Sequence, residues 1–358
     1  MLNTIQIIAL LGCRYSSLAI FGVLKLRMGN RFSKIILLII ILGFTNNSFA
    51  FFRPDSIYFR PFSHKFSVRA LVGIKELSIS ISNSSTLLGS ASKILYKPNN
   101  GLIGGVGVSY RNILLSYYFN VPGTELDHDK FGKTNINDYQ LSMTTRLLYL
   151  SGYHRTYSGF YVSKPNESYP NWDFSQPYPQ RPDIKYVTKG VETILNLNPR
   201  RYSLNSSLKF TEQQLLSVLS PLIYANYNLF NVSADSSIIP SHLQSNFFNG
   251  RKLYKTSFKG WAVMPGLSYN FIKNKWFINP IVFAGIGYMH KDLFFENNGI
   301  DKFNDYYFRM SIRLSYGYNS KNFFMGALAE WNELYLPEKN LMIKTENLNL
   351  MVVLGFRF

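Results

Sequence analysis

The sequence has one cysteine, little charge and few acidic residues. Only 16% of its 358 residues are Asp, Glu, Lys or Arg, well below the roughly 25% usual for soluble domains. The single Cys13 lies in an N-terminal segment that we expect to be removed, so the mature chain would form no disulfide. Although 38 basic residues against 20 acidic ones make a net charge of +18, no run of five Lys or Arg exists. We therefore predict no nucleic-acid partner.

Aromatic residues are abundant where charge is scarce. The chain holds 29 Phe and 25 Tyr, and aromatics make up 16% of it. Membrane β-barrels concentrate these residues at the two water interfaces and keep charge off the surface that faces lipid. The composition thus favours a membrane barrel over a soluble domain.

Residues 1–50 have the organisation of a signal peptide. From Met28, basic residues precede an apolar run at 35–44, and small residues follow up to Ala50. The run is shorter than the roughly twenty residues of a transmembrane helix. We predict cleavage after Ala50, with Met28 as an alternative start. A rival interpretation, a lipoprotein box acylated at Cys13, lacks a basic residue before its apolar run.

After residue 51 the apolar residues recur with a period of two, which indicates strands. In 306–318 aromatic residues lie at both ends of the apolar face and aliphatic ones between them, as in a strand that crosses a hydrocarbon layer between two aromatic girdles. The last strand, 346–358, alternates in the same way and ends on an aromatic residue, which is typical of the signal read by the barrel-assembly machinery. The predicted lipid-facing girdle residues are Tyr306, Phe308, Tyr316, Tyr318, Phe356 and Phe358.

The same alternation predicts twelve strands. They are 65–82, 102–110, 112–121, 137–149, 152–163, 202–210, 215–228, 258–271, 276–289, 306–318, 322–333 and 346–358. Short links near 111, 150–151, 213–214, 272–275 and 319–321 alternate with long links at 83–101, 122–136, 164–201, 229–257, 290–305 and 334–345. Bacterial barrels have short periplasmic turns and long extracellular loops, so both ends of the barrel are expected in the periplasm.

The predicted fold is therefore all-β: a transmembrane antiparallel up-and-down barrel of about twelve strands, within a range of 10–14. It would occupy residues 65–358 and follow a periplasmic segment at 51–64. Two runs, 92–96 and 191–197, are left open as an extra strand or a loop hairpin.

Several motifs occur in an order that resembles a known family. They are Leu95-Tyr96-Lys97-Pro98-Asn99, 105–110, 157–161, Tyr169-Pro170, Arg181-Pro182-Asp183, 201–214 and Gly285-Ile286-Gly287. Together, over roughly residues 60–358, they resemble an uncharacterised outer-membrane β-barrel family of Bacteroidota known only as a domain of unknown function. The resemblance implies a multi-pass barrel in a Gram-negative outer membrane, with no assigned activity or catalytic residues. After the glutamines this chain departs from the family's usual sequence at 215–218.

Charged residues on the inner faces of the predicted strands are the first candidate site. We expect Asp138, Arg146, Lys209, Arg309, Arg313 and Glu330 to line the lumen. A lumen rich in arginine either conducts anions or is sealed by ion pairs. A sealed lumen, with Arg309 and Arg313 paired to Glu330 on the next strand, is favoured because twelve strands leave a narrow interior.

Two further candidate sites lie in predicted outer loops. Asp127-His128-Asp129 places carboxylates beside an imidazole, an arrangement that could orient a general base or help to bind a metal, but an ordinary solvated loop tip is the favoured interpretation. The loop 164–201 holds Tyr169, Trp172, Phe174 and Tyr178 among prolines. These aromatics could cover the barrel mouth as a lid or stack on sugars.

We predict a non-enzymatic outer-membrane barrel with a structural, surface-interaction or narrow-channel role. Its expected partners are outer-membrane lipid and lipopolysaccharide, and no cofactor or metal is predicted. The alternative is an outer-membrane hydrolase or acyltransferase that acts at the outer leaflet.

Overall fold

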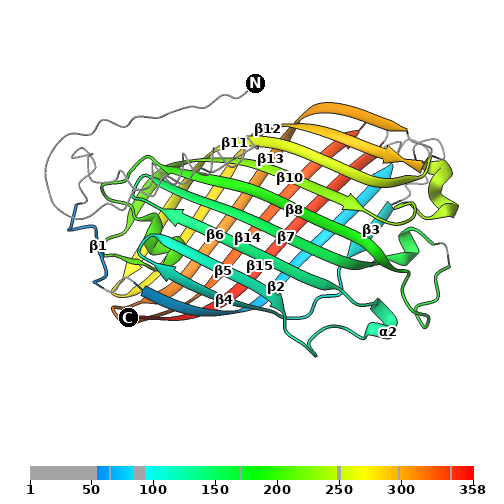
Figure 1. The fold of residues 1–358 in the computed structure, drawn as a ribbon. Helices are drawn as coiled ribbons and strands as arrows, with labels where there is room; N and C mark the ends of the chain where they lie inside the picture. Colours follow the sequence, from blue (N-terminus) through cyan, green and yellow to red (C-terminus); the bar gives the residue numbers. More distant parts are fainter. Residues whose placement is uncertain are drawn as a thin grey trace, which may run out of the picture. The chain divides into compact units, whose positions relative to one another are not determined.

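Twelve antiparallel strands form a closed barrel (Figure 1). The computed structural model describes residues 55–63, 66–83, 93–169, 171–247, 251–296, 299–338 and 341–358, all within one compact unit, 47–358. The predicted signal peptide and Cys13 lie outside the described residues. Among the described helices, none is long and apolar enough to cross a membrane.

Each barrel strand pairs with its neighbours in sequence order, and the last pairs with the first along their whole length. The strands are β2 (Phe66–Asn83), β4 (Ile103–Tyr110), β5 (Ile113–Asn120), β6 (Asn135–Thr144), β7 (Leu148–Val162), β8 (Gln180–Asn196), β10 (Val218–Ser233), β11 (Leu253–Lys273), β12 (Trp276–Phe295), β13 (Ile300–Asn319), β14 (Phe323–Glu338) and β15 (Leu341–Arg357). The predicted all-β barrel of twelve strands is confirmed. We call the end where β2 begins and β15 ends the near end, and the opposite end the far end.

Smaller elements lie at the two ends. The far end holds β3 (Lys93–Lys97), which pairs with β2 and β7, and the short helices α2 (His128–Phe131), η3 (Pro165–Glu167) and η5 (Ser241–Asn246). The near end holds β1 (Phe59–Pro61), which pairs with β9 (Glu212–Gln214), and the π-helix η4 (Asn205–Lys209). The sequence left two alternatives for the run 92–96, an extra strand or a loop hairpin. Its described residues belong to an extra strand, β3.

The predicted strand 202–210 is wrong. This segment forms η4 and adjoining turns inside the barrel, and Tyr202 and Phe210 are fully buried there. Its alternation of apolar and polar residues reflects packing within the interior instead of a lipid face. The missing barrel strand is β8, whose residues were assigned largely to a loop. The predicted number of twelve strands is still correct, because β8 takes the place of the predicted strand 202–210.

The predicted long loops at 290–305 and 334–345 are also wrong, because most of their residues extend the hairpins β12–β13 and β14–β15. The strands of the first hairpin consequently reach 20 residues each in β12 and β13, about twice the 9–11 residues that a transmembrane strand requires. More than half of such a strand can therefore extend beyond a hydrocarbon layer.

Along each long strand the inner and outer faces exchange character. On β2, the outward residues from Phe66 to Ile74 are apolar, whereas Glu76, Ser78 and Ser80 follow on the same outer face. The inner face changes in the opposite sense, from polar residues near Arg69 to the buried isoleucines near the far end. The near half thus has an apolar exterior and an interior that mixes polar and charged groups with an apolar cluster around Tyr202 and Phe283, whereas the far half has a polar exterior and an apolar interior.

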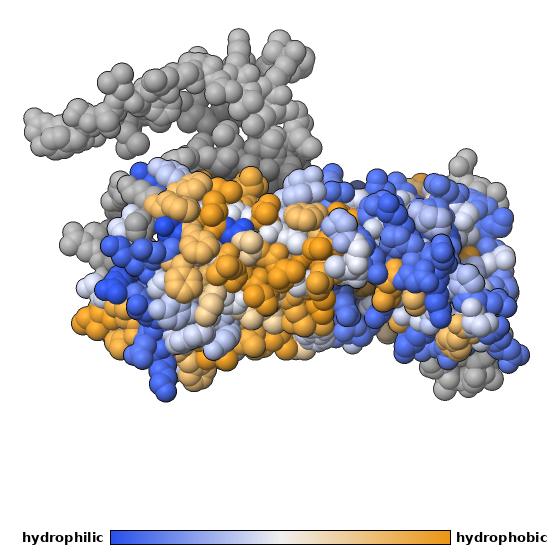
Figure 2. Space-filling model, turned by 90° about the horizontal axis from the view of Figure 1, so that it is seen from below, coloured by the Kyte–Doolittle hydropathy of each residue, from blue (hydrophilic) through white to orange (hydrophobic). Residues whose placement is uncertain are grey.

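The outer surface shows this division directly. In Figure 2 a hydrophobic band covers the near and middle part of the barrel, and the wall toward the far end is hydrophilic. Large exposed apolar side chains of this band include Val72, Val106, Leu267, Ile312 and Val352. Inside the far half, an apolar core is built from residues such as Ile79, Tyr96, Phe230 and Phe258.

Candidate functional site

The near end of the lumen is closed by the segment 197–217, which we call the plug. Its tip is Phe210, a fully buried residue with φ of 60°. The ring stacks on Phe324 at 5.1 Å between centroids and meets Phe277 edge-on at 5.3 Å. Glycine is needed beneath it, because a Cβ at Gly326 would meet the ring at 2.9 Å. The plug is therefore packed against the barrel wall as tightly as a protein core.

Three buried cations hold the plug to the wall. Arg69 of β2 donates from Nη2 to the carbonyl oxygen of Lys209 at 2.8 Å, and Arg357 of β15 donates to the carbonyl oxygen of Phe210. The ammonium of Lys209 in turn donates to the wall carbonyls of Asn112 at 2.7 Å and Ser142 at 3.0 Å. Burial lowers the pKa of Lys209 well below its usual range. These contacts link the plug to both sides of the barrel closure.

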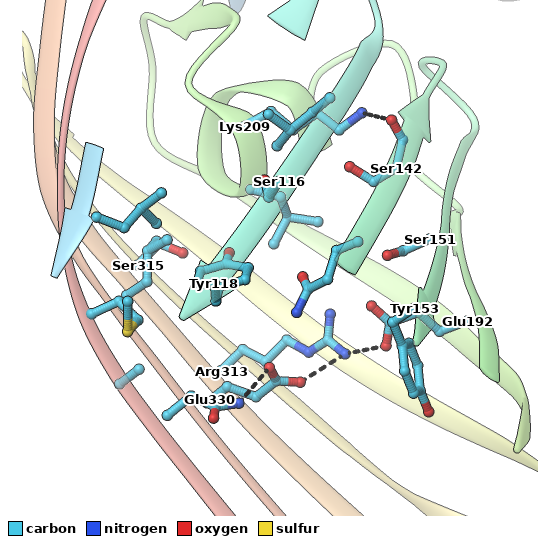
Figure 3. A pocket seen from close by; sticks show the side chains of 18 of the residues that line it. Ser116, Tyr118, Ser142, Ser151, Tyr153, Glu192, Lys209, Arg313, Ser315 and Glu330 are labelled. Atoms are coloured by element: carbon cyan, nitrogen blue, oxygen red, sulfur yellow. Dashed lines mark hydrogen bonds and ion pairs between the residues drawn. The ribbon is translucent and has the colours of Figure 1, made fainter. Parts of the chain in front are cut away.

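A first ion pair crosses the middle of the lumen. Arg313 on β13 lies 2.7 Å from Oε2 of Glu192 on β8 and 3.1 Å from Oε1 of Glu330 on the adjacent strand β14. In Figure 3 its guanidinium extends between the two carboxylates. Strands β10, β11 and β12 separate β8 from β13 in the sheet, so the contact with Glu192 spans the interior instead of following the wall.

A second cluster lies beside it on another part of the wall. Asp138 of β6, which is fully buried, accepts a hydrogen bond from Lys75 of β2 at 2.5 Å and lies 3.1 Å from Arg155 of β7. Lys75 also lies over the ring of Tyr118, 3.4 Å from its centroid. Buried charges are stable only when paired and hydrogen-bonded. In both clusters each charge faces one of opposite sign within 4 Å, and Nε of Arg155 and of Arg313 is left without a hydrogen bond.

A cavity of about 150 Å³ lies between these ion pairs and the plug. Figure 3 shows Tyr118, Ser142, Ser151 and Lys209 around it. Its floor is the plug and its roof is the charged layer, and the apolar core of the far half lies beyond. Three successive layers therefore occupy the interior of the barrel.

The residues predicted to line the lumen occupy three kinds of position. Asp138, Arg309, Arg313 and Glu330 point inward from strands, and Lys209 reaches the interior from the plug. Arg146 does not line the lumen; it is exposed in the turn 145–147, because β6 ends before it.

Of the two arginines expected to pair with Glu330, only Arg313 lies within 4 Å of it among the described residues. Arg309 lies beside aromatic rings, with its guanidinium carbon 5.9 Å from the centre of Tyr224. The sequence missed Glu192 because its strand was taken for a loop. The sequence also missed Lys75 and Arg155, which lie on predicted strands. The alternation of inward and outward residues along those strands could have shown that both point into the lumen.

The predicted girdle residues lie on the outer surface. Tyr306, Phe308, Tyr316, Phe356 and Phe358 are exposed, whereas Tyr318 is half-buried against Trp276 and Phe323. They fall within two bands, one at the near end and one where the apolar exterior ends.

The loop 163–179 contains the four aromatics proposed as a lid or a sugar platform. Tyr169 packs on the far-end core and stacks with His242 at 4.5 Å, and Trp172 lies against it. Tyr178 contacts Phe131 at 4.7 Å, whereas Phe174 is exposed. Tyr169 and Trp172 therefore pack against the far-end core, and Phe174 is exposed beside Tyr178.

The Asp127-His128-Asp129 cluster forms the start of α2. Oδ1 of Asp127 accepts a hydrogen bond from the backbone N–H of Asp129 at 2.9 Å, which makes it an N-cap. All three side chains are exposed. Within the described ranges, no group of three or more His, Cys, Asp or Glu residues is arranged to hold a metal ion.

Comparison with solved structures yields distant barrels. The outer membrane protease OmpT from Escherichia coli has 12% identity and a TM-score of 0.38, with 84% of this chain and 98% of that chain covered. The translocator domain of the autotransporter NalP from Neisseria meningitidis has 11% identity and a TM-score of 0.32, with 91% and 95% covered. The β domain of the Bordetella autotransporter BrkA has 9% identity and a TM-score of 0.34, with 82% and 100% covered.

No curated protein sequence matches the chain. A family model described as "Domain of unknown function (DUF4421)" matches residues 53–358. This match extends from the segment before β1 to the last strand, so it covers the plug as well as the barrel. The chain, a closed barrel of the outer-membrane type, therefore belongs to the DUF4421 family.

Proposed function

We propose that the protein is a sealed outer-membrane barrel that anchors a rigid, water-exposed wall and its loops at the cell surface. The apolar exterior of the near half supports insertion into a bilayer, because water would be excluded from that surface. Most turns at the near end are short, such as 111–112 and 274–275, whereas the far end carries longer loops such as 163–179. By the rule that periplasmic turns are short, the near end faces the periplasm.

The observation that carries this proposal is the contact of Arg313 with Glu192 across the lumen. A path for solutes would have to pass this ion pair and then the plug. Removing one partner of a buried ion pair costs about 3–5 kcal/mol, because the other charge is left uncompensated. Spontaneous opening at this layer is therefore expected to be rare.

The role that follows is to hold the loops of the far end on a rigid support at the cell surface. The far half of the barrel has an apolar core of its own, so it does not depend on lipid for its rigidity. It would hold loops such as 121–134 and 163–179 at a fixed height above the membrane surface. Exposed loop residues such as Phe174 would then be available to partners outside the cell.

Planar-bilayer recordings with the purified full-length protein test the seal. We expect no reproducible conductance steps from the intact protein. The double variant Lys209→Ala/Phe210→Ala removes the side-chain contacts of the plug's tip with the wall and should produce intermittent conductance. Phe271→Ala, an exposed aromatic residue on the lipid face of β11, is the matched control and should be as silent as the intact protein. Discrete, anion-selective steps from the intact protein would instead establish a pore.

A further inference from the structure

A row of aromatic residues marks the upper limit of the apolar exterior on one side of the barrel. The strand register pairs Tyr227 of β10 with Trp261 of β11, Trp261 with Tyr288 of β12, and Tyr288 with Tyr306 of β13. All four point outward. Figure 1 shows β10, β11 and β12 running beside one another on this side. Such aromatic rows lie at the boundary between hydrocarbon and headgroups.

Just beyond this row, toward the far end, the outward positions become basic. On β11 the next outward residue after Trp261 is Lys259, and the register places Lys259 opposite His290 of β12. On β8, Lys189 lies opposite Leu229, which is in turn opposite Lys259. The outward lysines of this surface, which we call the basic wall, are Lys185, Lys189, Lys255, Lys259 and Lys302.

These lysines are not neutralised by nearby carboxylates. Among the described side chains, no Asp or Glu lies within 4 Å of any of the five ammonium groups. The carboxylates on neighbouring outward positions have other contacts: Asp292 lies 3.0 Å from Nε2 of His290, and Asp183 pairs with Arg181 at 2.8 Å. The basic wall is therefore a positively charged surface whose five lysines form no direct ion pair with a described carboxylate, although the register places Asp292 opposite Lys302.

The opposite side of the barrel offers a direct contrast. There, Lys97 of β3 lies 3.9 Å from Glu76, and Lys344 of β15 is paired with Glu333. Lysines at the same level on the two sides thus differ in charge compensation. A general need for solubility would not confine unpaired lysines to one side.

From this placement we propose that the basic wall binds the phosphate groups of a phosphorylated glycolipid in the outer leaflet. One strand, β10, separates the strands of Lys189 and Lys259, so their backbones are about 10 Å apart, given the usual spacing of about 4.8 Å between strands. Two flexible ammonium groups at that separation can each take one phosphate. The aromatic row directly below would contact the sugar ring and the first methylenes of the acyl chains.

The position favours a lipid over a soluble anion. The lysines are continuous with the apolar exterior through Trp261 and Val263 on the same strand, so a ligand that carries both phosphate and acyl chains would use both surfaces at once. The inference rests on the outer-membrane orientation under the proposed function and not on the closed lumen. A conducting barrel would leave it intact.

The test measures binding of fluorescent bisphosphorylated lipid A to the full-length protein in neutral detergent micelles. The variant Lys189→Gln/Lys259→Gln removes two charges near the headgroup, and we expect roughly 30-fold weaker binding at low ionic strength. Lys97→Gln/Lys344→Gln on the opposite side is the matched control and should change the affinity less than about twofold. Retention of heat-modifiable mobility in gels would establish that both variants are folded.

Equal affinities of the two double variants would overturn the proposal. A second arm adds inorganic phosphate as competitor. If phosphate at low concentration displaced lipid A as well as unlabelled lipid A does, the surface would be a site for a soluble anion, and the lipid assignment would be wrong. If only the acylated competitor displaced it, the lipid assignment would stand.

Discussion

The near and far halves of the barrel are built from the same strands and differ in both their outer and their inner faces. In the near half β2 places Val72 outward and Arg69 inward, whereas in the far half it places Ser78 outward and Ile79 inward. The backbone alternation is continuous through the change. Under the proposed function, what differs is the solvent outside, lipid in one half and water in the other, and the residues follow it.

The side chains of the interior also differ between the two halves. A polar interior must satisfy its charges internally, and the near half does so with the clusters around Asp138 and Arg313. The far half excludes water with an apolar core, as soluble domains do. The comparison indicates that one strand can serve two solvents while its pairing with one neighbour stays continuous, as that of β2 with β15 does, provided that both faces change at the same level.

The largest expected effect comes from the apolar core of the far half. Phe258 is almost fully buried and stacks on Phe230 with ring centroids 4.4 Å apart. Phe258→Ala should lower the free energy of unfolding by about 3–5 kcal/mol, because it leaves a cavity. Urea titrations of the protein in detergent micelles measure this. Ser257→Ala, the outward neighbour, is the control; a similar loss in both would mean that the far half has no soluble-type core.

A smaller effect should distinguish the apolar and the polar part of the outer face of β2. Val72→Arg puts a charge on the lipid face of the near half and should cost about 2–4 kcal/mol if it lies near the bilayer midplane. Ser78→Arg, six residues further on the same outward face, should change the stability by less than about 0.5 kcal/mol. Folding into vesicles of phosphatidylcholine reports both values. Equal costs at the two positions would contradict the assignment of the boundary between them.

The smallest expected effect concerns the exposed His128 at the far end. His128→Ala should leave the unfolding free energy within about 0.5 kcal/mol of the intact protein, because the side chain is exposed. The same variant decides the enzymatic alternative. If the intact protein hydrolysed lipid or peptide and His128→Ala abolished this, the sealed barrel would also be an enzyme. Lys133→Ala, in the same loop, controls for changes in the loop itself.

Much of the fold was predictable because alternation leaves a local signal wherever a strand faces lipid. The strands around Tyr306 and Val352 were found for this reason. The signal fails where the outer face is polar, and the far ends of β12, β13 and β14 were accordingly assigned to loops. It also fails inside the barrel, where Tyr202 and Phe210 alternate with polar residues without forming a strand.

For the candidate site, the sequence could indicate which side chains point inward but not which of them meet. Arg313 and Glu330 lie on adjacent strands, and their pairing was predictable from the register. Glu192 lies four strands away in the sheet order, and its contact with Arg313 depends on barrel closure. Arg146 was wrongly predicted to line the lumen because the predicted strand 137–149 extended beyond Thr144, where β6 ends.

The sequence by itself determined the barrel, its approximate strand number and the lipid-facing surface, because these depend on local alternation and composition. Only the tertiary structure decided that the plug fills the near end, that the pair of Arg313 with Glu192 crosses the lumen and that no described carboxylate forms an ion pair with a lysine of the basic wall. Those features depend on distances between residues remote in the chain, and such distances are set by the closure and curvature of the sheet.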